Sequence, residues 1–179
     1  LKAMGYERSV GYDPYNKNHS EPTSAGLQFD LIYSFGVIEH VPCPGEFLCE
    51  HRRLIKDCGT VVIATPNASG LDPATPDVML MHQPYHRHIL SLEALEVLAK
   101  REGFNLVRTE HRNWMDTRHP GMNSRFLADY IDACGGMMDS LFEPYDVKLF
   151  CLSPRLWLSF WCGYYYPPTG YMICELKAN

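Results

Sequence analysis

Residues 29–67 read FDLIYSFGVIEHVPCPGEFLCEHRRLIKDCGTVVIATPN, and this stretch decides the fold class. It holds two apolar runs, residues 31–34 and 60–64, on either side of a segment whose apolar residues recur at helical spacing. Parallel strands need a crossover connection, usually a helix, so the order strand, helix, turn and strand favours a parallel sheet. We therefore predict an α/β fold with a mostly parallel sheet and functional groups at the carboxyl ends of its strands.

Polar residues follow both predicted strands. Glu39 and His40 come shortly after the first apolar run, and Asn67 ends the second. Histidine accepts protons near neutral pH, and a neighbouring carboxylate can orient it, so we predict that His40 and Glu39 are catalytic. The alternative for His40 is a structural role as a cap of the helix that follows.

The stretch resembles class I S-adenosyl-L-methionine (SAM) dependent methyltransferases, specifically the ubiquinone-biosynthesis-like group of small-molecule methyltransferases. The matching residues are Phe29-Asp30, Glu39-His40-Val41, Gly59 and Pro66-Asn67. The resemblance implies a Rossmann-like sheet with an antiparallel C-terminal strand. It also implies methyl transfer from SAM to a small-molecule acceptor, with an oxygen nucleophile as the expected acceptor atom. In such a reaction the protein aligns donor and acceptor and removes an acceptor proton.

The resemblance also implies which residues bind the cofactor. Asp13, with Tyr12 before it, matches an acidic residue that accepts hydrogen bonds from ribose hydroxyls. Ser34, Phe35 and Gly36 end the first predicted strand, where the methionine part of SAM is expected to lie against the backbone. For Asp13 the alternative is a plain turn, because Asp-Pro is a common turn starter.

Substrate-binding residues are expected on a loop that overhangs the pocket. The resemblance places a His- and Arg-bearing loop there, which makes His86 and Arg87 candidates, together with Asn67 at the strand end. The alternative for the two loop residues is a role in hydrogen bonds that anchor the loop.

No metal site is expected. Quinone-type members of the family carry an additional Glu three positions before Glu39, and the acidic and His groups together hold a divalent metal; that position is Gly36 here. A second metal interpretation rests on His82 and His86, which are spaced for one helix face. Pro84 lies between them and disfavours that helix.

The resemblance implies that the chain is N-terminally truncated. The family carries a first strand and a Gly-rich loop before the element that ends near Gly5, and neither is present among these residues. We therefore expect one partial methyltransferase domain over residues 1–179, with a helical insertion at about 114–168, and weak SAM binding by this chain alone. The alternatives are a non-catalytic binding or scaffold module and a nicotinamide-dependent enzyme.

Local patterns predict several further elements. Residues 8–12 and 104–109 read as strands, as do residues 171–176, and Ser91 is a plausible N-cap of a helix. Residues 31–33 form a continuous apolar run, as expected for a strand covered on both faces. Gly59 is expected at a left-handed position after the preceding helix.

Composition limits the class of protein and of partner. The net charge of −5 argues against a phosphate-binding surface, so we expect no nucleic-acid partner. Seven cysteines without a CxxC pair favour a reducing, cytoplasmic location. No apolar run reaches about 18 residues, so no stable membrane insertion is expected. The aromatic segment 154–166 is compatible with core packing, with a lid over an apolar pocket and with a peripheral membrane contact.

Overall fold

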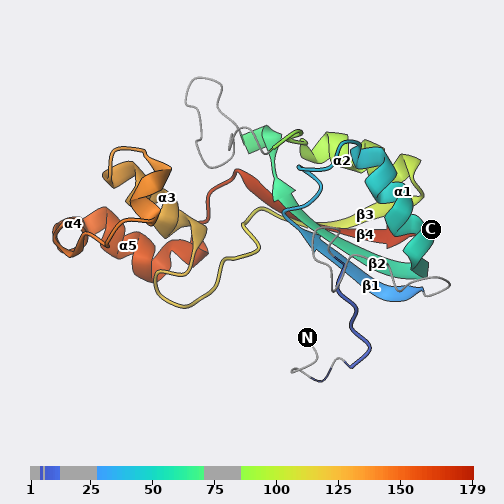
Figure 1. Ribbon diagram of the computed structural model, residues 1–179, viewed down its shortest axis with the longest axis horizontal. Helices are drawn as coiled ribbons and strands as arrows, with labels where there is room; N and C mark the ends of the chain where they lie inside the picture. Colours follow the sequence, from blue (N-terminus) through green and yellow to red (C-terminus); the bar gives the residue numbers. More distant parts are fainter. Residues whose placement is uncertain (1–4, 6, 13–27, 71–85) are drawn as a thin grey trace.

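The computed structural model describes residues 5, 7–12, 28–70 and 86–179 and has a mixed α/β architecture (Figure 1). Its described part contains a four-stranded sheet in the order β1-β2-β4-β3. The strands are β1 (Phe29–Phe35), β2 (Ile55–Pro66), β3 (Phe104–Glu110) and β4 (Tyr171–Ala178). β1 pairs with β2 in parallel, whereas β4 runs antiparallel to both β2 and β3. This confirms the predicted mostly parallel sheet with an antiparallel C-terminal strand.

The strand register brings four strand ends to one edge of the sheet. Phe35, the last residue of β1, lies opposite Ala64 near the end of β2. Pro66, the last residue of β2, lies opposite Tyr171, which begins β4. Glu110, the last residue of β3, lies opposite Ile173. We call this the carboxyl edge, because three of the four strands end there.

Two helices, α1 (Pro44–Leu54) and α2 (Leu92–Arg101), cover one face of the sheet (Figure 1). Helix α1 begins with Pro44, which is tolerated there because the first helical amide has no partner inside the helix. Helix α2 begins as predicted at Ser91, whose hydroxyl accepts a hydrogen bond from the Ala94 amide at 3.1 Å. A short 3-10 turn, η2 (Ala68–Gly70), follows β2.

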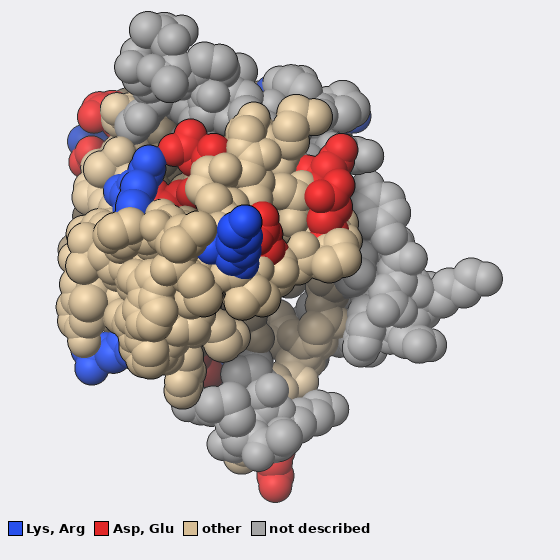
Figure 2. Space-filling view, turned by 90° about the vertical axis from the view of Figure 1, so that its left-hand side faces the viewer, with Lys and Arg blue, Asp and Glu red and all other residues tan. Residues whose placement is uncertain are grey.

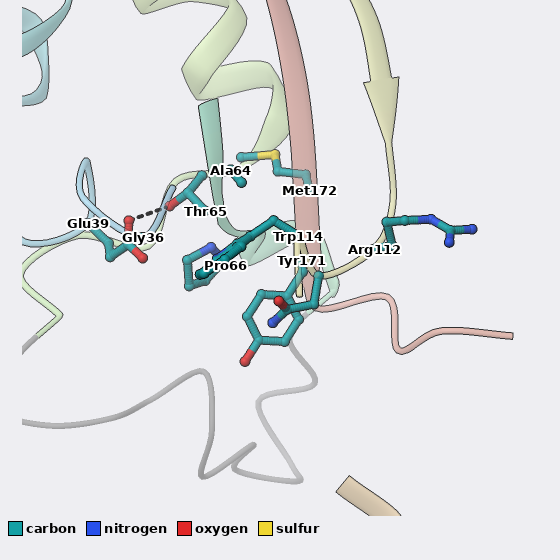
Figure 3. A pocket seen from close by; sticks show the side chains of 10 residues that line it. Gly36, Glu39, Ala64, Thr65, Pro66, Arg112, Trp114, Tyr171 and Met172 are labelled. Atoms are coloured by element: carbon teal, nitrogen blue, oxygen red, sulfur yellow. Dashed lines mark hydrogen bonds between the residues drawn. The ribbon is translucent and has the colours of Figure 1, made fainter. Parts of the chain in front are cut away.

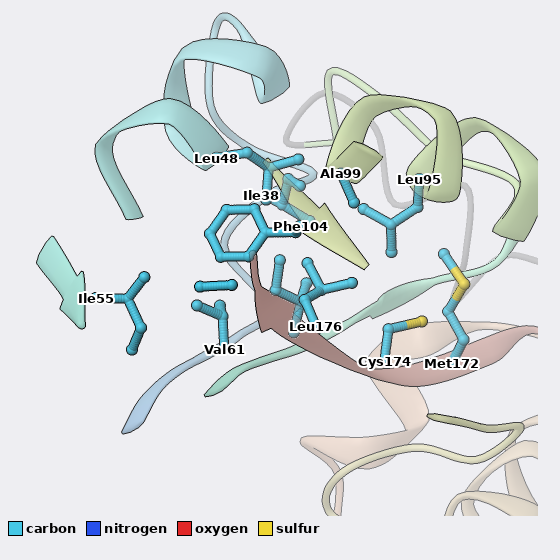
Figure 4. Close-up of a cluster of buried hydrophobic side chains, with 12 residues drawn as sticks. Ile38, Leu48, Ile55, Val61, Leu95, Ala99, Phe104, Met172, Cys174 and Leu176 are labelled. Atoms are coloured by element: carbon cyan, nitrogen blue, oxygen red, sulfur yellow. The ribbon is translucent and has the colours of Figure 1, made fainter. Parts of the chain in front are cut away.

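The main core lies between the sheet and these two helices (Figure 4). Buried residues alternate along the strands, as in Val61 and Ile63 of β2, because successive strand side chains point to opposite faces. Leu48 from α1 and Leu95 from α2 pack onto them, and Phe104 closes the core from β3. Burial of these side chains is the main stabilising contribution in this half of the molecule.

Strand β1 was expected to be covered on both faces, but one of its faces is largely exposed. Leu31 and Tyr33 are 55% and 49% exposed, so β1 is not covered on both faces. The reason is its place at the end of the described sheet, where α1 and α2 cover one face alone.

Two further local expectations are wrong. Residues 8–12, expected as a strand, have no regular secondary structure. Cys58, with φ 60°, takes the left-handed position expected for Gly59. Glycine is required at position 59 for a different reason, which is that a side chain does not fit there. A Cβ atom would lie 2.6 Å from Cγ1 of Ile55 and 2.9 Å from the Lys56 carbonyl oxygen.

The chain between β3 and β4, residues 111–170, forms a unit of short helices that we call the helical unit (Figure 1). Its elements are α3 (Ser124–Ala133), η3 (Met138–Leu141), α4 (Val147–Leu152), α5 (Pro154–Cys162) and η4 (Gly163–Tyr165). A small second core is built on Phe126, Tyr130 and Leu156. Within the described ranges, no helix combines the length and the apolar character needed to cross a bilayer.

The outer surface of the helical unit carries many large apolar side chains. Figure 2 looks onto this side of the molecule and shows a broad uncharged area. Helix α5 buries Leu156 and Ser159, but Trp157, Leu158 and Trp161 are each about half exposed. Core packing therefore accounts for one side of the aromatic segment 154–166 and leaves its other side at the surface.

Candidate active site

A shallow pocket lies at the carboxyl edge of the sheet (Figure 3). Its cavity volume is about 30 Å³, which is room for a few water molecules or an ion. Residues from the ends of all four strands meet around it. The residues that line it are Gly36, Glu39, Ala64, Thr65, Pro66, Arg112, Asn113, Trp114, Tyr171 and Met172.

Gly36 forms the turn that leads from β1 into the site. Its φ of 67° lies in the left-handed region that favours glycine. Its amide donates a hydrogen bond to the Ala64 carbonyl oxygen at 2.9 Å, which joins the ends of β1 and β2. A Cβ at this position would lie 3.7 Å from Oε1 of Glu39. The missing side chain therefore leaves open space beside the Glu39 carboxylate.

Glu39 is a buried carboxylate on the pocket wall, only 3% exposed. The Thr65 hydroxyl donates a hydrogen bond to Oε2 of Glu39 at 3.0 Å (Figure 3). In the described part of the chain, no lysine or arginine forms an ion pair with Glu39. Glutamate is rarely this buried in folded proteins, so this carboxylate is a candidate functional group.

The segment that follows the undescribed residues 71–85 is fixed to the turn that carries Glu39. The Arg87 and His88 amides both donate to the Glu39 carbonyl oxygen, at 2.8 and 3.2 Å. Nε2 of His88 donates to the Pro42 carbonyl oxygen at 3.2 Å. These hydrogen bonds hold the backbone next to His86 against the turn that carries Glu39.

This contact brings His86 next to His40. Their ring centroids are 4.9 Å apart, at an interplanar angle of 61°. One carboxylate oxygen of Glu39 and one ring nitrogen from each histidine all lie within 4.8 Å of one another. The structure therefore gathers the two predicted catalytic residues and one predicted substrate-binding residue at one place.

An aromatic wall borders the pocket on another side. Phe35 stacks on Trp114, with ring centroids 5.5 Å apart. Figure 3 shows the Arg112 side chain turned away from the pocket, and its guanidinium carbon lies 4.3 Å from the centre of the Tyr164 ring. Arg112, near the start of the helical unit, therefore connects the pocket edge to Tyr164 near the end of that unit.

Other predicted site residues are not part of this cluster. Tyr12 is exposed, and Asp13 lies outside the described residues. Asn67 is buried, but its amide oxygen accepts a hydrogen bond from the Ser69 amide at 3.0 Å and shapes the turn after β2. Arg87 is exposed near the rim.

Sequence reasoning missed Thr65, Trp114 and Tyr171 as site residues. Thr65 stands next to the quoted Pro66-Asn67 pair, so the rule that strand ends carry functional groups pointed to it. Trp114 closely follows the end of β3, and the same rule applies there. Tyr171 could not be found this way, because it begins an antiparallel strand and reaches the edge by its amino end.

Comparison with known proteins identifies the family. A family model described as a methyltransferase domain matches residues 1–109. The tRNA U34 carboxymethyltransferase of Aeromonas hydrophila is 31% identical over 113 residues, which are 58% of this chain and 34% of that protein. The ubiquinone biosynthesis O-methyltransferase of Caulobacter vibrioides is 40% identical over 58 residues, which are 32% of this chain and 23% of that protein. The matched regions thus span about a third or less of these relatives.

Two solved methyltransferase structures illustrate the similarity of fold. An S-adenosylmethionine dependent methyltransferase from Mesorhizobium loti has a TM-score of 0.45 at 13% identity, covering 84% of this chain and 62% of that one. The methyltransferase CcbJ from Streptomyces caelestis has a TM-score of 0.45 at 11% identity, covering 86% and 59%. Because the family model matches more than half of the sequence, the chain belongs to the class I family of SAM-dependent methyltransferases.

Proposed function

We propose that the protein transfers the methyl group of SAM to an oxygen atom of a small-molecule acceptor. Family membership supports the reaction type. The observation that carries the proposal is the convergence of Glu39, His40 and His86 beside a pocket at the carboxyl edge of the sheet. Ligands of open α/β sheets bind at this edge.

The residues at the end of β1 fit one side of the cofactor. Gly36 has no side chain in the space beside Glu39, and its left-handed backbone turns the chain away from the strand end. Phe35 and Trp114 offer a stacked apolar surface next to it. Ser34, Phe35 and Gly36 would hold the methionine part of SAM, and Asp13 with Tyr12 would bind the ribose. SAM supplies the reaction with a methyl group bound to a positively charged sulfur.

The chain's own groups act on the acceptor. His40 is exposed at the rim, where an acceptor hydroxyl can reach its ring and give up its proton. Glu39 is buried behind it and fixed by Thr65, so it can orient a polar group without moving. His86 and Arg87 belong to the segment that is hydrogen-bonded to this turn, which suits a role in binding acceptor substituents.

The class of acceptor is part of the proposal. The net charge of −5 disfavours the broad contact with phosphates that an RNA acceptor needs, and therefore favours a small molecule. One matched relative is named as a tRNA U34 enzyme, so RNA is the competing acceptor to test.

The proposed organisation is a single methyltransferase domain in a cytoplasmic protein. Helices at about 114–168 are the proposed insertion in that domain. The support is that β4, which follows the insertion, lies between β2 and β3 in the same sheet.

The test measures methyl transfer from SAM labelled in its methyl group. Incubation with phenolic and other hydroxyl-bearing small molecules, and separately with total tRNA, is expected to label a small molecule. His40→Ala is expected to lower turnover by about 100- to 10,000-fold, because a positioned base is lost, with little change in SAM affinity. His119→Ala, an exposed histidine of the helical unit, is the matched control.

Three results would contradict parts of this proposal. Labelling of tRNA would show that the acceptor is RNA and not a small molecule. If the chain binds SAM but transfers its methyl group to neither class of acceptor, the non-catalytic module is favoured. Turnover of His40→Ala within about threefold of the parent protein would assign proton removal to another group.

A further inference from the structure

Two arginines face one tyrosine ring where the chain connects the sheet with the helical unit. The guanidinium carbon of Arg112 lies 4.3 Å from the centre of the Tyr164 ring, and that of Arg118 lies 5.5 Å from the same point. The two guanidinium carbons are therefore at most about 10 Å apart, which is about one Debye length at roughly 0.1 M salt, so their positive charges repel each other. Arginine stacks on aromatic faces, and the Tyr164 ring thus holds both side chains against this repulsion.

The carboxylates nearby do not neutralise this pair of charges. Oε2 of Glu110 lies 3.8 Å from Nε of Arg112, but both side chains are partly exposed, and such a pair contributes little to stability. Oδ1 of Asp116 accepts a hydrogen bond from the Ser124 amide at 2.6 Å. Among the residues that the structure describes, no carboxylate forms an ion pair with Arg118. Arg118 therefore carries a positive charge that an external anion can pair.

Arg112 has hydrogen-bonding capacity that the described part of the chain does not use. Its buried Nη1 atom has no hydrogen-bond partner among the described residues, and its side chain as a whole is 24% exposed. A guanidinium offers five N–H donors in a planar fork that fits a carboxylate or a phosphate. An anion held between two guanidiniums separates their carbons by roughly 8 Å, because each charge-assisted contact is about 2.7–2.9 Å long. The spacing limit set by the Tyr164 ring therefore allows one anion to bridge Arg112 and Arg118.

The two arginines lie beside the pocket of the candidate active site. Arg112 belongs to the residues that line the pocket, although Figure 3 shows that its side chain extends away from Glu39. Trp114 lines the pocket as well and is 47% exposed. Arg112 and Arg118 lie two and four residues from Trp114 along the chain. A molecule that lies on the exposed side of Trp114 can therefore reach from the pocket to the two guanidiniums.

The charge of this segment is opposite to that of the whole chain. Residues 108–125 carry four arginines and two carboxylates, whereas the chain has a net charge of −5. The negative charge elsewhere disfavours a long polyanion, which would contact a wide surface. A small anion needs the local positive site alone, and a local positive field raises its concentration there. The charge distribution therefore fits a small acidic molecule better than a nucleic acid.

We propose that Arg112 and Arg118 bind the carboxylate or phosphate group of an anionic acceptor. The proposal rests on the proposed methyl transfer, and it narrows the acceptor to a small hydroxyl compound that carries an acidic group. The arginines hold the acidic group at the helical unit, while the hydroxyl lies at the pocket near His40. Arg112 and Arg118 are thus specificity residues that bind the acceptor and take no part in proton removal.

The binding test follows the side-chain Nε–Hε signals of the arginines by NMR in ¹⁵N-labelled protein. The chain is titrated with inorganic phosphate, and separately with succinate, at constant ionic strength and without SAM or acceptor. The Arg112 and Arg118 signals are expected to shift together and to saturate with one dissociation constant for each anion. The anion that binds more tightly indicates whether the acceptor carries a phosphate or a carboxylate. The signal of Arg53, which pairs with the exposed Glu50, should not saturate.

Variants assign the site. Arg118→Met should weaken binding of the better anion by at least about tenfold, because a charge-assisted hydrogen bond is lost. Arg118→Lys keeps the charge without the planar fork and should restore part of the affinity. Arg53→Met is the matched control and should leave anion binding unchanged. Far-UV circular dichroism checks folding, which is expected to persist because Arg118 is exposed.

A substrate test separates this site from the reaction. Hydroxyl compounds are offered with labelled SAM as free carboxylates or phosphates and as the corresponding methyl esters, and the free acids should be the better acceptors. Arg118→Met should raise KM for the free acid by at least about tenfold and change kcat by less than about threefold, because it removes binding that is equal in ground and transition states. If neither form is methylated, the proposed function fails, and the anion titration alone decides the site.

Four results would overturn the proposal. They are shifts that do not saturate, unchanged anion binding in Arg118→Met, equal methylation of acids and esters, and saturation of the same signals by total tRNA at a lower concentration of phosphate groups than by inorganic phosphate.

Discussion

The sheet half of the molecule and the helical unit reach stability in different ways. The main core beneath α1 and α2 holds twelve buried residues in the described chain, whereas the core of the helical unit holds three. The family model covers residues 1–109 and ends before the helical unit. The comparison indicates that the sheet half is held by buried apolar surface, while the helical unit depends more on individual contacts.

Polar and aromatic contacts join the helices of the helical unit. The Asn123 amide oxygen accepts a hydrogen bond from the Phe126 amide at 2.9 Å, and its nitrogen donates to the Ser159 carbonyl oxygen at 3.1 Å. One side chain thus caps α3 and holds α5. Tyr130 and Tyr145 stack with ring centroids 4.6 Å apart, and burial raises the pKa of Tyr145 to about 12. These contacts add to the small apolar core of the unit.

Truncation of Phe104 should give the largest loss of stability. Phe104→Ala removes a fully buried ring from the main core and is expected to lower the free energy of unfolding by about 3–5 kcal/mol. Trp157→Ala in the helical unit should cost less than about 1 kcal/mol, because that side chain is 45% exposed. Denaturant unfolding followed by circular dichroism measures both. Equal losses would break the comparison between the two halves.

Gly163→Ala should destabilise the helical unit by about 1–3 kcal/mol through overpacking. The added Cβ would overlap the Asn123 amide oxygen and lie 3.1 Å from Cβ of Arg125. Hydrogen exchange should show faster exchange in α3 and α5 and unchanged exchange in β2 and β4. In an Asn123→Ala background the added cost should largely disappear. A cost that persists there would remove Asn123 from the explanation.

Arg155→Met should cost about 1–2 kcal/mol, less than a fully buried pair, because the Arg155 side chain is 62% exposed. Its guanidinium donates to the buried Asp129 at 2.7 Å and to Asp132 at 2.9 Å, so the substitution leaves Asp129 without its nearest cation. Arg53→Met, which breaks an exposed pair with Glu50, is the control and should change stability little. Equal effects would show that burial of Asp129 contributes nothing measurable.

The pH-dependent loss of stability caused by His51 of α1 should be the smallest of these effects. Burial holds the pKa of His51 below its ordinary value of 6.5, although Nδ1 donates to the Phe47 carbonyl oxygen at 2.7 Å. Below pH 6.5 the unfolded chain therefore binds a proton that the folded chain does not, so stability falls as pH falls towards the lower folded pKa.

The non-titrating variant His51→Phe isolates this contribution. The free energy of unfolding of both proteins is measured at pH 7.5 and pH 5.5. It should decrease less in the variant, and the two decreases should differ by less than about 1.4 kcal/mol per pH unit. An identical decrease in both proteins would exclude His51 as a source of pH dependence in the sheet half.

Much of the sheet half was predictable from local sequence. Apolar runs located β1 and β2, and the Ser91 cap located α2, because strand and helix periodicity and capping are local properties. The antiparallel direction of β4 came from the family resemblance, whereas its position between β2 and β3 was not predicted, because a strand's neighbours are not encoded in its own residues. The left-handed Cys58 was missed because tertiary space, and not backbone preference, decided where the glycine is needed.

The site was predictable in part. Glu39 and Gly36 were identified from the strand-end rule and do line the pocket. The proximity of His86 to His40 was not predicted, because it arises from hydrogen bonds between segments more than forty residues apart in the sequence. The binding and catalytic roles assigned to these residues stay predictions for the experiments above.

The pairing of β3 with β4 makes the helical unit a replaceable module. Its two ends leave the sheet from neighbouring strands, at Glu110 of β3 and at Tyr171 of β4, two residues before Ile173, the ladder partner of Glu110. Neighbouring strands lie about 5 Å apart, so a folded insert whose two ends lie close together can join them without a change of strand register. Substitution of this segment by that of another methyltransferase would then change the part of the pocket lining that Arg112, Asn113 and Trp114 supply, while Glu39, His40 and His86 stay in place.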